Sequence, residues 1–323
     1  MIVAALALSA MLAGCNGTQT QPQTNPSSQP QPPAFQSVRD GVTPQPVPAG
    51  ALKINADRAW EYNKEVVAFG SRPVGSEGHA KLEAWIRAKL KNDNLEVDEF
   101  PIDSPAGQFT GRNYIAKFPG KKDGIIVIAG HYDTVYNLPK AFVGANDGGS
   151  STALPVAIAD VLRGKPNDGY SVWILLTDAE EAFQKWSATD SLYGTKHLAE
   201  KWKQDGTAAK IKAFILVDMI GDKDLDIDED KNSTPWLRKV VYQAASDLAE
   251  QSHFFVRPNE LEDDHLPFAR IGVPVVDVID IDYGYNNVFH HSVEDTLDKE
   301  SEKSLEIVGN VVLETVRLVD EKQ

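Results

Sequence analysis

Near-continuous apolar runs of strand length occur four times along the chain and alternate with segments of helical periodicity. The runs contain few polar positions, as expected for strands that are buried on both faces of a sheet. They occupy residues 124–130, 171–177, 212–218 and 274–280. Helical patterns lie at about 150–163, 191–204, 235–251 and 300–320. This alternation predicts a three-layer α/β/α sandwich around a mostly parallel, mixed central sheet.

Two helical patterns come first in the folded part, and the one that can be assigned to particular residues is GSEGHAKLEAWIRAKLKND. Its apolar positions recur at helical spacing and are Leu82, Trp85, Ile86 and Leu90. Ser76 is a suitable N-cap for this helix. No internal repeat is visible, and we expect residues 51–323 to form a single catalytic domain.

The first 50 residues differ in composition from the rest of the chain. Residues 1–15 form a short apolar run that ends at Cys15, which is typical of a lipoprotein-type signal segment. Residues 16–50 are rich in Pro and Gln and predict a flexible tether. Because Cys15 is the only cysteine, no intrachain disulfide can form. We expect an extracytoplasmic protein of a bacterial periplasm or cell surface, attached to the membrane only through a lipid at Cys15.

The charge of the chain excludes one class of partner. A formal net charge of −15 disfavours nucleic acid, whose phosphates would be repelled, and suits cationic ligands such as peptides with a free N-terminal amine. The acidic run 222–232 lacks the central Gly and closing Glu of an EF-hand loop, and we interpret it as a solvated loop.

Polar side chains gather where the predicted strands end. In open α/β sheets, ligands bind beyond the carboxyl ends of the strands. The residues at these ends or in the turns between them are His131, Asp133, Asp147, Asp178, Glu180, Glu181, Asp218, His290 and His291. Histidine nitrogens and carboxylate oxygens are the ligands of catalytic zinc, and one glutamate of an adjacent pair can remain free as a general acid or base. The pattern therefore predicts a zinc-dependent active site at this edge of the sheet.

Two stretches make the chain resemble a known family: EEAFQKWSATDSLYGTKHLA, residues 180–199, and DDHLPFARIGVPV, residues 263–275. They are similar to the zinc aminopeptidases related to bacterial leucyl aminopeptidase. Within that group they are closer to the animal-type glutaminyl cyclases, which convert N-terminal glutamine of peptides to pyroglutamate and release ammonia. The resemblance covers nearly all of the chain from about Asp57 to Val319 and implies a zinc-aminopeptidase-like fold.

The resemblance implies a set of metal ligands. Asp147, Glu181 and His291 match the ligands of one zinc ion per chain. The aminopeptidases use the positions of His131 and Asp218 for a second zinc, which is bridged to the first through the position of Asp147.

The resemblance also assigns the remaining roles. Glu180 matches the proton shuttle, and Asp218 and Asp263 match acidic residues that form a hydrogen-bonded network with it. Trp186 matches an indole that lines the substrate pocket. Cyclisation then needs no water nucleophile, because the substrate's own α-amine attacks its γ-carboxamide.

The chain departs from the animal cyclases next to the zinc histidine. His290 stands where those enzymes have an indole, and the preceding loop is longer. We expect His290 and Tyr285 to contact the substrate; Tyr283 and Phe289 could also form an aromatic wall or could simply pack in the core. His290 could ligate the metal in place of His291, although the spacing of the following HSVED favours His291.

Three hypotheses follow for the function. The first is a zinc-dependent glutaminyl-peptide cyclotransferase with one zinc ion. The second is a zinc aminopeptidase with two, which the complete ligand set favours. The third, a non-catalytic binding protein on the same scaffold, requires missing ligands, and none is missing from the sequence.

Overall fold

The computed structural model describes residues 35–322, and its folded unit begins at Gln36. The predicted signal segment 1–15 and most of the tether lie outside the described residues and stay predictions. The tether prediction is wrong for residues 36–50, which lie against the domain. The backbone N–H of Val38 donates to Glu229 Oε1 at 2.9 Å, and that of Gln45 donates to Asp247 Oδ1 at 2.6 Å. Val38 and Val42 pack on the core, and these contacts repay the ordering of a Pro-rich segment.

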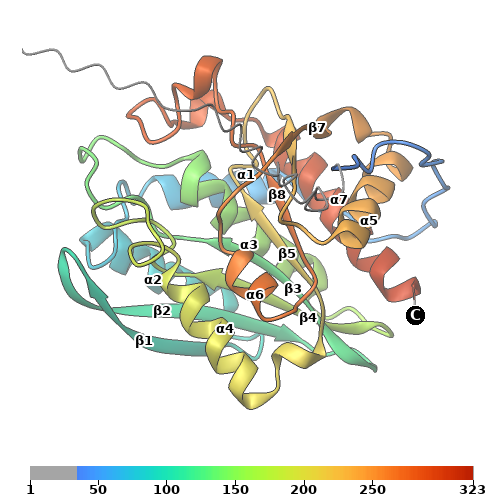
Figure 1. The fold of residues 1–323 in the computed structure, drawn as a ribbon, viewed down its shortest axis with the longest axis horizontal. Helices are drawn as coiled ribbons and strands as arrows, with labels where there is room; N and C mark the ends of the chain where they lie inside the picture. Colours follow the sequence, from blue (N-terminus) through green and yellow to red (C-terminus); the bar gives the residue numbers. More distant parts are fainter. Residues whose placement is uncertain (1–34, 323) are drawn as a thin grey trace, which may run out of the picture. The chain divides into compact units, whose positions relative to one another are not determined.

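A six-stranded sheet lies at the centre of this unit, in the order β1-β2-β4-β3-β5-β8 (Figure 1). The strands are β1 (Glu96–Ser104), β2 (Gly107–Phe118), β3 (Lys122–His131), β4 (Tyr170–Thr177), β5 (Ile211–Asp218) and β8 (Val275–Ile279). The pairs β3–β4, β3–β5 and β5–β8 are parallel, whereas β1–β2 and β2–β4 are antiparallel. A small parallel sheet pairs β6 (Ile227–Asp230) with β7 (Phe254–Asn259). The predicted mixed, mostly parallel sheet is confirmed.

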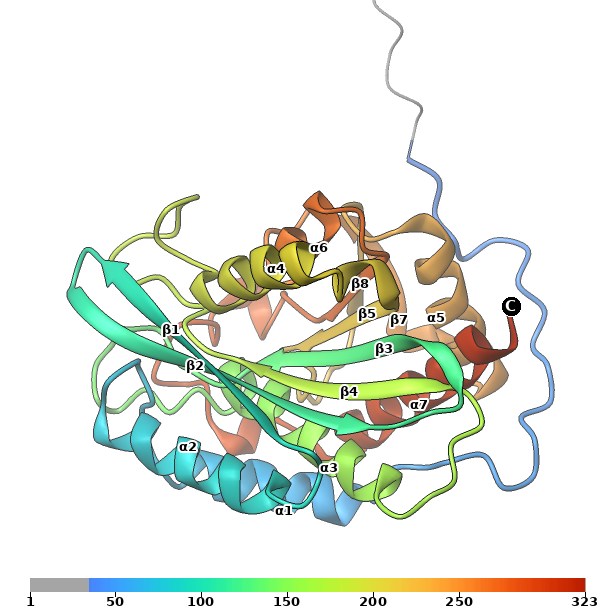
Figure 2. The same ribbon diagram turned by 90° about the horizontal axis from the view of Figure 1, so that it is seen from below.

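Helices cover both faces of the sheet, as expected for an α/β/α sandwich. They are α1 (Ala56–Val67), α2 (Glu77–Leu90), α3 (Ser151–Leu162), α4 (Tyr193–Asp205), α5 (Pro235–Asp247), α6 (Leu266–Arg270) and α7 (Glu302–Glu321). Figure 2 shows α1, α2 and α3 below the sheet and α4 and α6 above it. Ser76 caps α2 as predicted, because its side chain accepts a hydrogen bond from the backbone N–H of His79.

The central strands are apolar at nearly every position because both faces of the sheet are buried. In β3, Ile126 and Ile128 pack in the core that includes α1, α3 and α7, whereas Val127 and Ala129 pack in the core that includes α4 and α6. All four side chains are completely buried. Successive side chains of a strand point to opposite faces, so a strand between two helical layers needs apolar residues at every position.

The acidic run is not the solvated loop that the sequence suggested, because β6 buries part of it. Asp228 lies 3.0 Å from Arg257 Nε, and Glu229 lies 3.1 Å from Arg238 Nη1. These partners offset the cost of burying the carboxylates. Between residues 35 and 322 no helix combines the length and apolarity needed to cross a membrane.

Candidate active site

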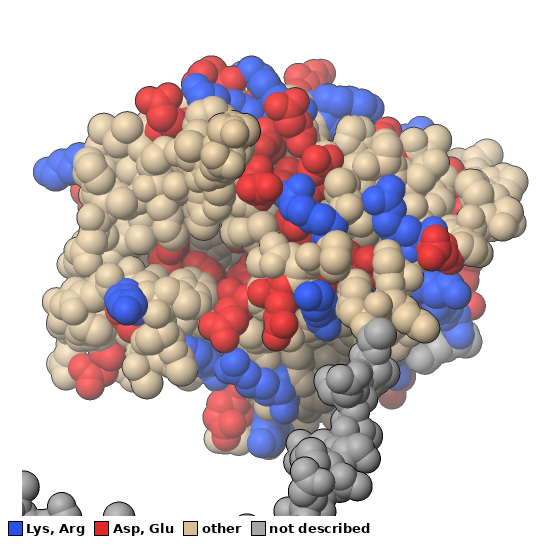
Figure 3. Space-filling view, turned by 45° about the horizontal axis from the view of Figure 1, so that its top comes forward, with Lys and Arg blue, Asp and Glu red and all other residues tan. Residues whose placement is uncertain are grey.

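A cavity of about 270 Å³ lies at the carboxyl ends of β4, β5 and β8. Its lining residues are Asp147, Glu180, Glu181, Trp186, Asp218, Met219, Leu261, Glu262, Asp263, Ile279, Ile281, His290 and His291. Most of the sequence-predicted site residues are therefore brought together in one place; the exceptions, which do not line the cavity, are His131, Asp133, Asp178 and Tyr285. Asp178 instead pairs with His79, whose Nε2 lies 2.7 Å from its Oδ1. In Figure 3 the molecule is turned so that the top of Figure 1 comes forward, and Asp and Glu side chains gather in and beside a hollow on this face.

Three side chains converge as metal ligands would. His291 Nε2 lies 3.1 Å from Asp147 Oδ2 and 3.1 Å from Glu181 Oε1. Ligand atoms around a tetrahedral zinc with bonds of about 2.1 Å lie roughly 3.4 Å apart, which is close to this spacing. Asp147 Oδ2 is buried and has no hydrogen-bond partner of acceptable geometry. The donor set, the two distances from His291 and this oxygen fit a zinc ion. His290 is a further candidate ligand, because Asp147, His290 and His291 offer ligand atoms that all lie within 4.8 Å of one another.

Asp147 also belongs to a second cluster, deeper in the protein. His131 Nε2 lies 3.3 Å from Asp147 Oδ1 and 3.1 Å from Asp218 Oδ1. His131 is only 1% exposed and does not line the cavity. His290 lines the cavity, with its Nε2 3.9 Å from Asp147 Oδ2, so it lies farther from this carboxylate than His291 does.

The Glu180–Glu181 turn is held by one buried carboxylate. Asp133 Oδ1 accepts the N–H of Glu180 at 3.1 Å, and its Oδ2 accepts the N–H of Glu181 at 3.3 Å. The preceding Ala179 has a φ of 55°, an unfavourable value for alanine. Such backbone strain occurs at functional sites, where the surrounding contacts hold it in place. Here the turn directs two adjacent glutamates into the same cavity.

Asp147 is positioned by residues that no sequence pattern singles out. Asp295 accepts the N–H of Asn146 at 2.8 Å and the N–H of Asp147 at 3.2 Å. The fully buried guanidinium of Arg72 donates to the carbonyl oxygens of Val143 and Gly144 in the same loop. Together these contacts fix the backbone from which the Asp147 carboxylate projects.

We expect the substitution Asp295→Asn to lower zinc affinity by about 10- to 100-fold, the usual effect of losing a hydrogen bond that orients a ligand. An amide offers one acceptor oxygen, so one of the two backbone N–H groups is left without its partner. Competition with a chelator of known affinity measures the effect. Glu294→Gln, an exposed change in the same loop, is the control, and equal affinities of the two variants would contradict the role of Asp295.

The acidic groups of the cavity share one electrostatic environment. Burial raises the pKa of Glu180 well above its usual range; His131 opposes this shift, while Glu181 and Asp263 add to it. Burial and the nearby Asp218 likewise raise the pKa of Asp263, whose buried Oδ2 has no hydrogen-bond partner. Carboxyl groups this close cannot all ionise at neutral pH, so at least one proton is retained among them.

An apolar wall faces the acids. It is formed by Met219, Leu261, Ile279 and Ile281 together with the indole of Trp186. Trp186 Nε1 donates to Glu262 Oε2 at 3.4 Å. The cavity thus combines a polar, metal-binding side with an apolar side that can hold an aliphatic chain.

The structure does not place Tyr285 in the cavity, so its contact with substrate stays a prediction. Its side chain is 85% exposed and does not line the cavity. The left-handed backbone of Asn286 and Asn287, with φ of 55° and 59°, reverses the chain here and leaves Tyr285 in solvent. Tyr283 and Phe289 form an edge-to-face pair, with ring centroids 5.3 Å apart, that packs behind the apolar wall. The core interpretation therefore holds for these two aromatic residues.

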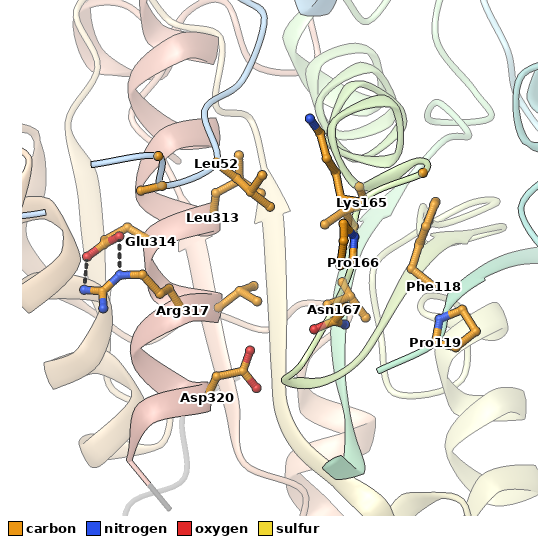
Figure 4. Close-up of a pocket in the computed structure, with 16 residues that line it drawn as sticks. Leu52, Phe118, Pro119, Lys165, Pro166, Asn167, Leu313, Glu314, Arg317 and Asp320 are labelled. Carbon is orange, nitrogen blue, oxygen red and sulfur yellow. Dashed lines mark hydrogen bonds and ion pairs between the residues drawn. The ribbon is translucent and has the colours of Figure 1, made fainter. Parts of the chain in front are cut away.

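A second cavity, of about 380 Å³, lies at the opposite end of β4, between α3 and α7 (Figure 4). Three of its charged side chains have partners: Arg317 Nε donates to Glu314 Oε2 at 2.9 Å, and Asp320 Oδ1 accepts the N–H of Tyr170 at 2.7 Å. None of the candidate metal ligands described above lines it, so the chemistry belongs to the acidic cavity.

Residues 113–316 match the family model described as Peptidase family M28. The chain belongs to peptidase family M28. This assignment and the donor set described above point to zinc as the metal of the acidic cavity.

Three of the proteins to which the chain is similar are glutaminyl cyclases. The glutaminyl-peptide cyclotransferase of Drosophila melanogaster is 29% identical over 239 residues, which cover 66% of this chain and 68% of that protein. The crystal structure of an Acidobacteriales bacterium glutaminyl cyclase superposes with a TM-score of 0.83 at 50% identity, covering 86% of this chain and all of that one. Porphyromonas gingivalis glutaminyl cyclase gives a TM-score of 0.72 at 26% identity, over 82% of this chain and 98% of that one. The resemblance to glutaminyl cyclases and the fold class are confirmed.

Proposed function

We propose that this M28 protein is a zinc-dependent glutaminyl-peptide cyclotransferase, which closes N-terminal glutamine of peptides into pyroglutamate and releases ammonia. The observation that carries the proposal is the presence of Glu180 beside the cluster of Asp147, Glu181 and His291 in one cavity. The glutaminyl cyclases named above, one of them 50% identical, support the choice of reaction.

One zinc ion per chain is part of the proposal, held by Asp147, Glu181 and His291. The His291 side chain is 38% exposed, so this cluster opens onto the cavity, whereas in the other cluster His131 is buried and does not line it. A catalytic zinc needs an open position for substrate, and the cluster with the exposed histidine is the one that we propose to provide it. Bound there, zinc supplies a Lewis acid for the γ-carboxamide oxygen.

The proton transfers belong to Glu180. The neutral α-amine attacks the γ-carboxamide carbon, a C–N bond forms, and Glu180 accepts the proton that the amine loses. Glu180 then donates this proton to the departing amide nitrogen, which leaves as ammonia, so the carboxyl ends in its starting state. A carboxyl with a raised pKa suits both transfers near neutral pH.

The other residues of the cavity hold the reactants. Burial and the nearby Asp218 raise the pKa of Asp263, which limits the negative charge around Glu180. Trp186 and the aliphatic wall enclose the glutamine side chain and limit water, which favours ring closure over hydrolysis. Six acidic residues line the cavity, and among its described lining residues there is no Lys or Arg, so a cationic N-terminus is attracted.

The alternative is a zinc aminopeptidase with two metal ions. The cluster of His131, Asp147 and Asp218 favours it, because it shares Asp147 with the first cluster and could hold a second ion. The relatives named above are cyclases, which favours cyclisation.

A purified sample given a Gln-initiated peptide amide and its Leu-initiated counterpart tests the proposal. We expect mass spectrometry to show the loss of one ammonia from the first peptide and no change in the second. Shortening of either peptide, with no loss of ammonia, would mean that the same site activates water.

A further inference from the structure

We propose that Glu262 makes the enzyme prefer peptides whose second residue is basic. The inference rests on the proposed function, because it concerns the residue that follows the N-terminal glutamine. The inference restricts the preferred substrates from all peptides with an N-terminal glutamine to those in which a basic residue follows the glutamine.

Glu262 occupies the mouth of the catalytic cavity. The other five carboxylates of the lining are buried, at 7% exposure or less, whereas Glu262 is exposed. Its one hydrogen bond within residues 35–322 comes from Trp186 Nε1, at 3.4 Å. Oε1 of Glu262 therefore remains available to a ligand. A charge at the mouth is in contact with solvent and with whatever part of the substrate leaves the cavity.

The peptide must leave by this mouth. Ring closure joins the α-amine to the γ-carboxamide carbon beside Glu180, so both groups face the metal side of the cavity. The α-carbonyl and the rest of the chain then point outward. The second residue is the first part of the substrate to pass Glu262 and Trp186.

A second hollow continues the path outside the mouth. It is lined by Asn232, Glu260, Glu262, Leu266, Ala269 and Arg270, and it shares Glu262 with the catalytic cavity. Two carboxylates and one guanidinium line it, and Lys196 lies near enough to interact with both Glu262 and Arg270. The negative field therefore comes from the exposed Glu262 together with the catalytic cavity behind it, which is lined by six acidic residues and, among its described lining residues, by no Lys or Arg. A Lys or Arg side chain at the second position of the substrate meets a favourable field here, and a Glu side chain meets an unfavourable one.

The expected effect is modest, because the ion pair would form in contact with water. Exposed pairs contribute enough for about a three-fold difference in kcat/KM. The difference lies in KM, since the contact is the same before and during ring closure. It shrinks at high ionic strength, because salt screens exposed charges.

The test compares kcat/KM for Gln-Lys, Gln-Ala and Gln-Glu peptide amides at low and high salt. We expect the order Lys, Ala, Glu in the wild type at low salt. Glu262→Gln keeps an oxygen for the Trp186 indole but removes the charge, so the three values should converge. Glu200→Gln, an exposed glutamate on α4 outside both hollows, is the control and should keep the wild-type order.

The outcomes separate this inference from the proposed function. Equal kcat/KM for the three peptides in the wild type overturns the inference and leaves cyclisation intact. A preference that persists unchanged in Glu262→Gln also overturns it. If no Gln-initiated peptide is cyclised, the proposed function fails and the inference fails with it.

Discussion

Replacing Glu180 with Gln lowers kcat for cyclisation by on the order of 10²–10⁴-fold, the usual contribution of a positioned general base. The introduced amide keeps the volume and polarity of the side chain but cannot accept and return a proton. Glu180 is buried, with a raised pKa, and it lines the cavity beside the metal cluster. Steady-state ammonia release from a Gln-initiated peptide, measured on samples of equal zinc content, gives the effect.

The neighbouring glutamate provides the matched comparison. Glu181→Gln weakens a metal ligand, so its loss of activity should be accompanied by a loss of bound zinc and reduced by added zinc. Glu180→Gln should keep its zinc and gain nothing from an excess. A Glu180→Gln variant that retains kcat within a few-fold of the wild type would assign the proton transfer to another group.

Removing the metal abolishes cyclisation and lowers the melting temperature. A ligand present at about 100 times its Kd stabilises the folded state by roughly 2.7 kcal/mol, which is worth about 5–10 °C for a domain of this size. The loss has a local cause, because Asp147 and Glu181 then face each other without a cation between them. Dialysis against a chelator, followed by scanning fluorimetry and the ammonia assay, measures both effects, and added zinc should restore both.

The variant His291→Ala tests whether zinc binds at the proposed site. This variant should show no zinc-dependent rise in melting temperature, whereas an alanine in place of His253, which lies outside the cavity, should leave the rise intact. Full activity in the chelated wild type would contradict a metal-dependent mechanism.

Much of the fold could be predicted from the sequence because its central strands are buried on both faces. Alternate residues of β3 face different helical layers, so the apolar run is unbroken and easy to recognise. The first helix and the hairpin of β1 and β2 lack this signature. The hairpin lies at the edge of the sheet, where polar and apolar positions mix, and α1 has a strongly polar exposed face.

Site residues at or just after the ends of strands could be predicted from the sequence. Residues whose position depends on the geometry of a loop could not. Asp218 ends β5 and Glu180 lies in the turn that follows β4, and the sheet brings them together. Asp295 lies four residues after His291, and no property of the sequence shows that it accepts the N–H of Asp147. Tyr285 shows the converse, because a short reversal of the backbone places a candidate pocket residue in solvent.

The most direct test measures ammonia release and Leu-anilide hydrolysis in parallel on one zinc-loaded preparation. The proposed geometry predicts ammonia release from a Gln-initiated peptide and no anilide cleavage, because the enclosed cavity favours the substrate's own amine over water. Anilide cleavage without ammonia release would contradict it, and would mean that Glu180 and the metal cluster activate water.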